Sequence, residues 1–285
     1  MPDVIVVGGG PAGISAAIYL RRFKRDVLVL MKDFGALGKA ESIENYYGFP
    51  EPITGAELLR RGIAQAERLG VKVAKEEVLA IEADATFTVK TNHGVHQATT
   101  VLLSTGMTRV NLKAKHYADF IGKGISFCAV CDGFLYRQKK IGIVGNGEFM
   151  LEELEILRNF SADLTVFTNG EPLAHHPEHA VVVTEPLLEL IGSDHLESVK
   201  TLTKTYPLDV LFIAVGTASA ADFALRIGAM MEQNQIVIDA NYMTNIPGLF
   251  AAGDCIGGLQ QVAKAVADGA GAGIAIHKYL KSLTS

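Results

Sequence analysis

A glycine-rich turn between an apolar run and a helical pattern is the feature that most constrains this chain of 285 residues. The turn spans Gly8 to Gly13, follows the apolar residues 4–7, and opens a stretch with helical periodicity. A second apolar run at 27–30 comes at the spacing of a βαβ unit. Strand, tight turn and helix in this order are typical of dinucleotide-binding folds, so the sequence predicts an α/β domain of that type.

Residues of this turn are candidates for binding a pyrophosphate. Gly8 lets the chain turn, Gly10 lets backbone N–H groups approach the ligand, and Gly13 lets helix and strand pack closely. The helix N-terminus adds positive potential. Asp33 follows Gly13 by about twenty residues and is the candidate acceptor for a ribose hydroxyl, although the strand before it ends early. The predicted set in this part of the chain is Gly8, Gly10, Pro11, Ala12, Gly13 and Asp33.

Composition and charge restrict the class of protein. An apolar content of 49% is enough for two domains of about 100 to 200 residues each. The net charge of -5 argues against broad nucleic-acid binding. The N-terminus does not resemble a signal peptide, and no run of about eighteen uncharged apolar residues occurs. We therefore expect a cytoplasmic protein with neither a membrane nor a nucleic acid as partner.

The chain has three cysteines, two of which form the motif Cys128-Ala-Val-Cys131. Three cysteines exclude a disulfide-stapled secreted scaffold and leave a redox-active pair as the favoured interpretation. The residues after Cys128 could form a helical turn, whose N–H groups would lower the pKa of a thiol. Asp132 follows the second cysteine and could shuttle the protons of dithiol chemistry. We predict Cys128, Cys131 and Asp132 as the catalytic residues.

Two other interpretations of the cysteines remain open. A zinc site needs four ligands, and the chain offers neither a second Cys-x-x-Cys nor a well-spaced histidine pair. His175, His176 and His179 cluster, but Pro177 interrupts them, so a polar loop is the better interpretation and no metal is predicted. The cysteines could also be a buried, inert pair of small residues.

A second glycine turn follows the apolar run 141–144, and its sequence departs from the dinucleotide-binding pattern. Met150 stands where close helix packing favours glycine or alanine, and Glu148 adds a carboxylate where a pyrophosphate would lie. Residues 159–199 contain neither lysine nor arginine. We expect a Rossmann-like fold with poor nucleotide binding. Backbone contacts to NADH, or a distant arginine such as Arg137 or Arg158, are the open alternative.

Five segments together resemble the low-molecular-weight thioredoxin reductase family, and the resemblance covers nearly the whole chain. That family binds FAD and reduces thioredoxin. By resemblance, Cys131 would face the flavin, Cys128 would attack the thioredoxin disulfide, and Asp132 would donate a proton. The family usually has arginine where Gln260 stands. The segments are Gly8 to Gly13, Glu44 to Gly48 with the motif Glu-Asn-Tyr-Tyr-Gly, Ser104-Thr105-Gly106, Cys128 to Gly133, and Phe250 to Asp254 with the motif Phe-Ala-Ala-Gly-Asp.

The resemblance also implies how FAD would be held. Asn45 and Asp254 would bind it directly. Gln260-Gln261-Val262-Ala263 opens an alanine- and glycine-rich helix that runs to about Leu280, and its N-terminus would lie beside the flavin. The resemblance adds these residues to the predicted FAD site: Asn45, Thr105, Gly106, Gly253, Asp254, Gln261 and Val262.

In lacking the pyridine-nucleotide motifs, the chain resembles the ferredoxin-dependent flavin thioredoxin reductases. This similarity makes ferredoxin the expected donor, with electrons passing through FAD to the Cys128–Cys131 disulfide and then to thioredoxin. Three alternatives remain: an NAD(P)H-dependent thioredoxin reductase with a divergent site, a ferredoxin–NADP-type flavoenzyme without a dithiol role, and a non-catalytic flavin-binding redox sensor.

The expected architecture has two Rossmann-like domains, the second inserted in the first. Residues 1–114 and 244–285 would form a discontinuous FAD-binding domain, and residues 115–243 a disulfide domain with a degenerate pyridine-nucleotide fold. Alternating charged and apolar residues at 73–101 predict short antiparallel strands. The family resemblance also implies a homodimer.

Overall fold

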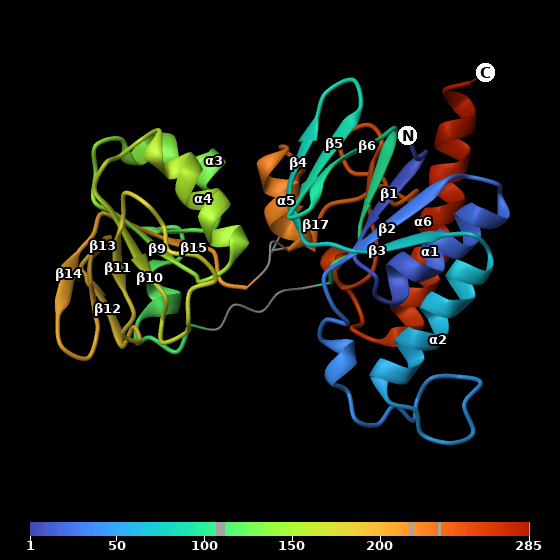
Figure 1. The fold of residues 1–285 in the computed structure, drawn as a ribbon, viewed down its shortest axis with the longest axis horizontal. Helices are drawn as coiled ribbons and strands as arrows, with labels where there is room; N and C mark the ends of the chain where they lie inside the picture. The colour runs from blue at the N-terminus through green and yellow to red at the C-terminus, as the bar shows by residue number, and fades with distance from the viewer. Residues whose placement is uncertain (107–111, 217–218, 233–234, 285) are drawn as a thin grey trace. The chain divides into compact units, whose positions relative to one another are not determined.

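The computed structural model describes residues 1–106, 112–216, 219–232 and 235–284, without the side chain of Cys131. Contacts divide the chain into two compact units, which we call the first unit (1–107 with 219–285) and the second unit (108–218) (Figure 1). Each unit contains a parallel sheet with helices packed on it. This confirms the predicted α/β fold with two Rossmann-like parts.

The first unit is built on a five-stranded parallel sheet with the order β18-β7-β1-β2-β3. β1, β7 and β18 are buried along their whole lengths, as continuous apolar strands between two covered faces should be. The strands are β1 (Val4–Val7), β2 (Val27–Met31), β3 (Lys72–Lys75), β7 (Thr100–Leu103) and β18 (Leu249–Ala251).

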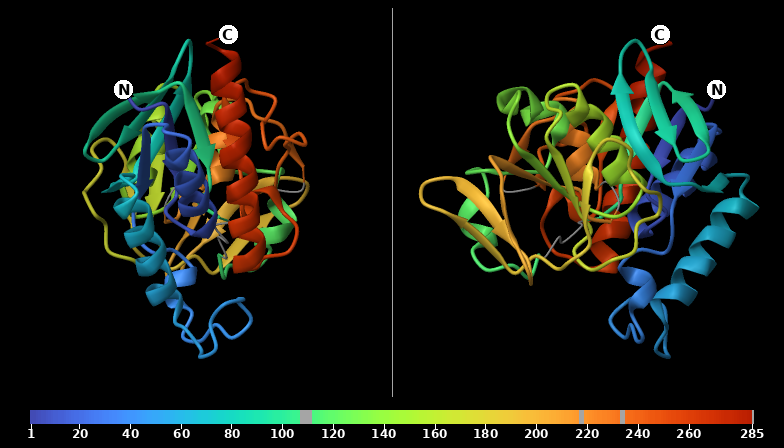
Figure 2. Two further views of the ribbon diagram at one scale, coloured as in Figure 1. Left: turned by 90° about the vertical axis from the view of Figure 1, so that its right-hand side faces the viewer. Right: turned by 60° about the vertical axis from the view of Figure 1, so that its left-hand side comes forward.

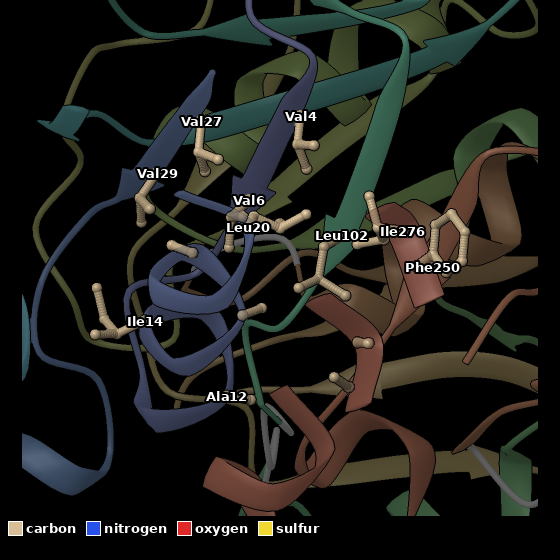
Figure 3. Packing of buried hydrophobic residues seen from close by; sticks show 14 of the residues in the cluster. Val4, Val6, Ala12, Ile14, Leu20, Val27, Val29, Leu102, Phe250 and Ile276 are labelled. Atoms are coloured by element: carbon tan, nitrogen blue, oxygen red, sulfur yellow. The ribbon is translucent and has the colours of Figure 1, made fainter. Parts of the chain in front are cut away.

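Two helices, α1 (Pro11–Arg22) and α6 (Val262–Ser282), run side by side and share one core with the sheet (Figures 1 and 2). Figure 3 shows Leu20 of α1 beside Val6 of β1, and Ile276 of α6 beside Leu102 of β7 and Phe250 of β18. Glycines of α6 allow the close approach: a Cβ on Gly269 would lie 2.0 Å from the carbonyl oxygen of Ala12. The predicted alanine- and glycine-rich helix is confirmed; it begins at Val262, two residues after the expected start at Gln260, and ends at Ser282.

The first unit also contains α2 (Gly55–Arg68) and the short helices η1 (Leu37–Lys39) and η4 (Asp254–Ile256). Thr54 caps α2 by accepting the backbone N–H of Glu57. Among the strands predicted between 73 and 101, only β4 (Val78–Ala83), β5 (Phe87–Thr91) and β6 (Gly94–Ala98) are antiparallel. β3 and β7 instead join the parallel sheet, where they pair with β2 and β1.

Residues 219–243 lie in the first unit, whereas the sequence placed them in the inserted domain. They form α5 (Ala220–Arg226), β16 (Met231–Glu232) and β17 (Gln235–Ile236). The backbone N–H of Ala220 donates to Thr105 Oγ1 at 2.6 Å, and Arg226 donates to the carbonyl oxygen of Leu79 at 3.2 Å. These long-range hydrogen bonds, which local sequence patterns do not encode, explain the difference from the predicted join at 243/244.

The second unit has a parallel sheet with the order β11-β10-β9-β15-β8 and a three-stranded antiparallel sheet with the order β12-β13-β14. The parallel strands are β8 (Ile125–Ser126), β9 (Ile141–Val144), β10 (Leu164–Phe167), β11 (Val181–Val183) and β15 (Val210–Ile213). The other elements are η2 (Tyr117–Phe120), α3 (Ala129–Asp132), η3 (Gly133–Tyr136), α4 (Glu148–Arg158), β12 (Glu189–Gly192), β13 (Leu196–Lys200) and β14 (Thr205–Pro207).

The second glycine turn connects β9 to α4, which confirms the strand, turn and helix expected there. The helical turn expected after Cys128 is also present, as α3 followed by η3. Among the described helices of either unit, none combines the length and the apolar character needed to cross a membrane.

Candidate active site

The first glycine turn lies between the end of β1 and the start of α1. Gly8 has a φ of 112°, and a Cβ there would lie 2.4 Å from the carbonyl oxygen of Ser104. A Cβ on Gly13 would lie 2.0 Å from the carbonyl oxygen of Gly8, so both positions require glycine for packing. A Cβ on Gly10, by contrast, would meet nothing within 4 Å. The open space at Gly10, beside the N-terminus of α1, fits a pyrophosphate.

Several of the other predicted FAD residues are brought close to this turn by α6 and the segment before it. Gly253 has a φ of 85°, and a Cβ on it would lie 3.0 Å from the Cβ of Ala12. Asn45 Nδ2 donates to Gln261 Oε1 at 2.9 Å, which ties the 43–53 loop to the start of α6. Asp254 begins η4, and Val262 is the first residue of α6. This clustering in one unit fits the dinucleotide that the family resemblance implies.

The remaining predicted residues have local roles in the fold. Thr105 Oγ1 accepts the backbone N–H of Ala220, so this hydroxyl fixes the start of α5. Gly106 has a φ of 75°, in the region that favours glycine. Asp33 lies beyond the end of β2 and is exposed, and its Oδ1 accepts the N–H of Gly35 at 2.7 Å. Asp33 therefore forms a turn at the edge of the site.

Lys264 is a residue of this site that the sequence reasoning missed. Its ammonium group donates to the carbonyl oxygen of Gly253 at 3.0 Å and to that of Gly257, and it pairs with Asp268 at 2.7 Å. Asp268 in turn accepts the N–H of Gly253 at 3.2 Å. The pair thus fastens the 253–257 turn to α6. The available signal was an i,i+4 Lys–Asp pair at the start of an otherwise apolar helix.

The predicted catalytic cysteine motif lies in the second unit, at the start of α3. Cys128 is buried and disulfide-bonded, and its backbone N–H donates to Ser126 Oγ at 3.2 Å. Ser126 Oγ donates to Asp132 Oδ2 at 2.7 Å, so one hydroxyl links the first cysteine to the predicted proton donor. The side chain of Cys131 lies outside the described atoms, and its pairing with Cys128 remains a prediction.

Glu153 is a second residue that the sequence reasoning missed. It lies on the buried face of α4 and is 2% exposed. Glu153 Oε2 accepts the backbone N–H of Ala129 at 2.8 Å, directly after Cys128. An acidic residue among the apolar positions of an amphipathic helix is a signal that could have identified it, because a buried carboxylate needs a partner.

The second glycine turn does not offer the open space of the first. Met150 is fully buried, and its Cβ would lie 2.7 Å from a Cβ on Gly145. Asn146 Nδ2 donates to the carbonyl oxygen of Pro172 at 3.1 Å, and the carbonyl oxygen of Asn146 accepts the N–H of Ala174 at 2.8 Å. Segment 172–175 is therefore hydrogen-bonded onto the turn that would have to bind phosphates.

Charge at this turn also opposes a phosphate. Glu148 is the first residue of α4, and its Oε1 lies 3.0 Å from Nε2 of His175. The carboxylate thus occupies the helix end that attracts anions. The two arginines that the sequence left as alternatives have other contacts: Arg158 pairs with Glu155, and the Arg137 guanidinium lies 5.0 Å from the centre of the Phe134 ring.

Cys255, next to the predicted FAD residue Asp254, is a free thiol buried in the first unit. Its Sγ donates to the carbonyl oxygens of Ala252 and Leu103 at 3.3 and 3.5 Å. Burial raises the pKa of the Cys255 thiol to about 12. The thiolate, which is the reactive form, is therefore scarce at neutral pH.

Cys255 should consequently resist alkylation in the folded protein. At pH 8, we expect iodoacetamide to label it about 10³-fold more slowly than in urea, because a pKa near 12 leaves few thiolates. The rate in the folded state should rise with pH until the protein unfolds. Mass spectrometry of the peptide that contains Cys255 measures this rate, and equal labelling in both states would contradict a buried thiol.

Comparisons with known proteins agree with the fold of each unit. The family model described as pyridine nucleotide-disulphide oxidoreductase matches residues 2–269. The thioredoxin reductase of Aquifex aeolicus is 30% identical over 98% of this chain and 93% of its own. Among solved structures, the atypical thioredoxin reductase TRi from Desulfovibrio vulgaris Hildenborough is 35% identical, with a TM-score of 0.91 and 99% coverage of both chains. A ferredoxin-flavin thioredoxin reductase from Clostridium acetobutylicum is 26% identical, with a TM-score of 0.73 over 99% and 98%.

Proposed function

Because this chain belongs to the pyridine nucleotide-disulphide oxidoreductase family, as an FAD-dependent thioredoxin reductase, we propose that its electrons come from ferredoxin and not from NAD(P)H. The observation that carries the proposal is the second glycine turn, onto which segment 172–175 is hydrogen-bonded. Glu148 there places a carboxylate where a nucleotide would bring phosphates. The similarity to the ferredoxin-flavin thioredoxin reductase of Clostridium acetobutylicum supports the same donor.

The first unit would hold the FAD. The turn from Gly8 to Gly13, with Pro11 and Ala12, would bind the pyrophosphate through backbone N–H groups at the start of α1. Asp33 would accept a ribose hydroxyl. When bound, FAD supplies redox chemistry that accepts electrons singly or in pairs, which suits a one-electron donor and a two-electron disulfide. The other residues proposed to bind it are Asn45, Thr105, Gly106, Gly253, Asp254, Gln261 and Val262.

The second unit would carry the disulfide chemistry. Two electrons and two protons would convert the proposed Cys128–Cys131 disulfide into a dithiol, and FAD, when bound, would supply the electrons. By resemblance, Cys131 would be the sulfur that faces the flavin. The Cys128 thiol would pass its proton to the Asp132 carboxylate and attack one sulfur of the thioredoxin disulfide, and the other thioredoxin sulfur would leave with that proton from Asp132. The Cys131 sulfur would then displace the bound thioredoxin sulfur, and the Cys131 proton would pass to that leaving sulfur. This step re-forms the Cys128–Cys131 disulfide and releases thioredoxin as a dithiol.

An apolar surface follows the cysteine motif and suits a protein substrate. Val130, Phe134 and Leu135 are large apolar residues that are 50%, 59% and 65% exposed. They lie on α3 and η3, within seven positions of Cys128. Exposed apolar side chains clustered beside a reactive group indicate a docking site, which supports thioredoxin as the partner. A homodimer and a cytoplasmic location remain predictions from the sequence and the family.

Anaerobic flavin spectroscopy tests the donor. Reduced bacterial ferredoxin should bleach the flavin absorbance, whereas NADPH and NADH should leave it unchanged, because the second turn cannot seat their phosphates. Subsequent addition of oxidised thioredoxin should restore the absorbance. Bleaching by dithionite is the control that shows a competent flavin. Rapid bleaching by either nucleotide would instead make this protein an NAD(P)H-dependent thioredoxin reductase with a divergent site.

A further inference from the structure

The backbone N–H groups nearest to Cys128 are already bound to other acceptors. The N–H of Cys128 donates to Ser126 Oγ, and that of Ala129 donates to Glu153 Oε2. Such N–H groups at the start of a helical turn are what normally stabilises a thiolate and lowers its pKa. Here the second of them is turned toward a carboxylate on α4, so it is not available to the sulfur of Cys128.

The burial of Glu153 makes this contact more than a surface hydrogen bond. The residue is 2% exposed, and it belongs to the buried face of α4 together with Phe149, Met150 and Leu154. Burial disfavours the ionised form of a carboxyl group, whereas an N–H donor favours it, and a low dielectric strengthens the effect of any charge on neighbouring groups. An ionised Glu153 would oppose the formation of a second negative charge on the sulfur of Cys128.

Other charged groups face the same motif. Asp132 on α3 is linked to Cys128 through Ser126. Tyr136 on η3 has a raised pKa because of burial and the nearby charge of Asp132. The Arg137 guanidinium lies over the Phe134 and Phe160 rings. When ionised, the carboxyl groups of Asp132 and Glu153 would both disfavour a thiolate on Cys128. Glu153 differs from Asp132 because it lies on α4 and takes no part in the proposed proton transfer.

We propose that Glu153 is a positioning residue that fixes the start of α3 and keeps the Cys128 thiolate unfavourable, so that the reduced dithiol is a stronger reductant. The proposal rests on the proposed function only in taking Cys128 as the attacking thiol. A reduced form that is less stable has a lower reduction potential, which favours passing electrons on to another disulfide. In this role Glu153 acts through its hydrogen bond with the Ala129 amide and through its charge.

The test is the equilibrium of the purified holoenzyme with dithiothreitol, measured at several pH values by trapping thiols for mass spectrometry. Glu153→Gln keeps an oxygen that can accept the Ala129 N–H but removes the charge. If the pKa of Cys128 falls by about one unit from about 8.5, the equilibrium should shift toward the dithiol by about 3-fold at pH 8 and by about 8-fold at pH 9. At pH 6 the shift of the equilibrium should vanish, because Cys128 is then a neutral thiol in both proteins and the charge of Glu153 affects only the thiolate.

Glu155→Gln is the matched control, because Glu155 lies on the same helix but is exposed and paired with Arg158. It should leave the equilibrium unchanged at every pH. A Glu153→Gln shift that is absent, or is equal at pH 6 and pH 9, would overturn the proposal and leave Glu153 a purely structural residue. If this variant does not fold, the alkylation profile of Cys128 in Cys131→Ser decides, because a Cys128 pKa well below about 8.5 would also overturn it. None of these measurements uses ferredoxin or NAD(P)H. A result that contradicts the role of Glu153 would therefore leave the proposal of ferredoxin as the electron donor unaffected.

Discussion

Replacing Cys128 by serine should lower thioredoxin reduction by about 10³-fold or more while ferredoxin still bleaches the flavin. Removing a nucleophile typically costs rates of this order, because the remaining groups cannot form the covalent intermediate. Cys128 is not among the residues proposed to bind FAD, which lie in the first unit, so the variant should retain its FAD. Stopped-flow bleaching and a thioredoxin-coupled assay measure the two half-reactions separately.

Cys131→Ser is the matched variant for assigning the two sulfurs. It should also be inactive in turnover, but its Cys128 should form a stable mixed disulfide with thioredoxin that gel electrophoresis detects. Cys128→Ser should form much less of it. The reverse pattern would exchange the roles of the two cysteines. Full thioredoxin reduction by Cys128→Ser would contradict a dithiol mechanism and favour the ferredoxin–NADP-type flavoenzyme instead.

Local patterns were sufficient for the parts of the fold in which neighbours in sequence make the structure. The turn from Gly8 to Gly13 and the helical turn after Cys128 were predicted because glycine spacing and short motifs determine their geometry. Met150 and Glu148 predicted a poor second site for the same reason. At the second turn, the apolar run 141–144 and the glycines after it indicated a Rossmann-like fold, whereas Glu148 and Met150 indicated weak nucleotide binding.

Long-range contacts explain what the sequence did not reveal. The hydrogen bonds of Asn146 with segment 172–175 cross about 26 positions, and that of Ala129 with Glu153 crosses 24. β3 pairs in parallel with β2, although α2 separates the two strands in the sequence. The alternation of charged and apolar residues at 73–101 did not indicate this parallel pairing. Likewise, residues 219–243 join the first unit through bonds to Thr105 and Leu79. Such contacts depend on how elements are packed, and a single sequence contains no direct signal for them.

Gly269→Ala should lower the stability of the first unit by about 3 kcal/mol, at the upper end of the usual cost of overpacking. The added Cβ would lie 2.0 Å from the Ala12 carbonyl oxygen and 2.9 Å from the Ser15 Cβ. The first obstacle is a backbone atom, so α6 must move away from α1, and the core shown in Figure 3 must open. The shift should disturb Ala12 within the first glycine turn, so FAD should dissociate more readily. Thermal unfolding followed by flavin fluorescence should show a midpoint lower by about 6–12 °C.

Gly62→Ala provides the same substitution in a helix of the same unit with the opposite expected sign. A Cβ on Gly62 of α2 would meet only Ile14 Cγ2, at 3.4 Å, which is ordinary contact. The variant should gain about 0.5–1 kcal/mol, because alanine is the better helix former. A loss of similar size in both variants would mean that glycine in these helices matters for a reason other than the approach of α6 to α1. A loss of stability in Gly269→Ala but not in Gly62→Ala would identify the close approach of α6 to α1 as the contact that holds the first glycine turn in its binding geometry.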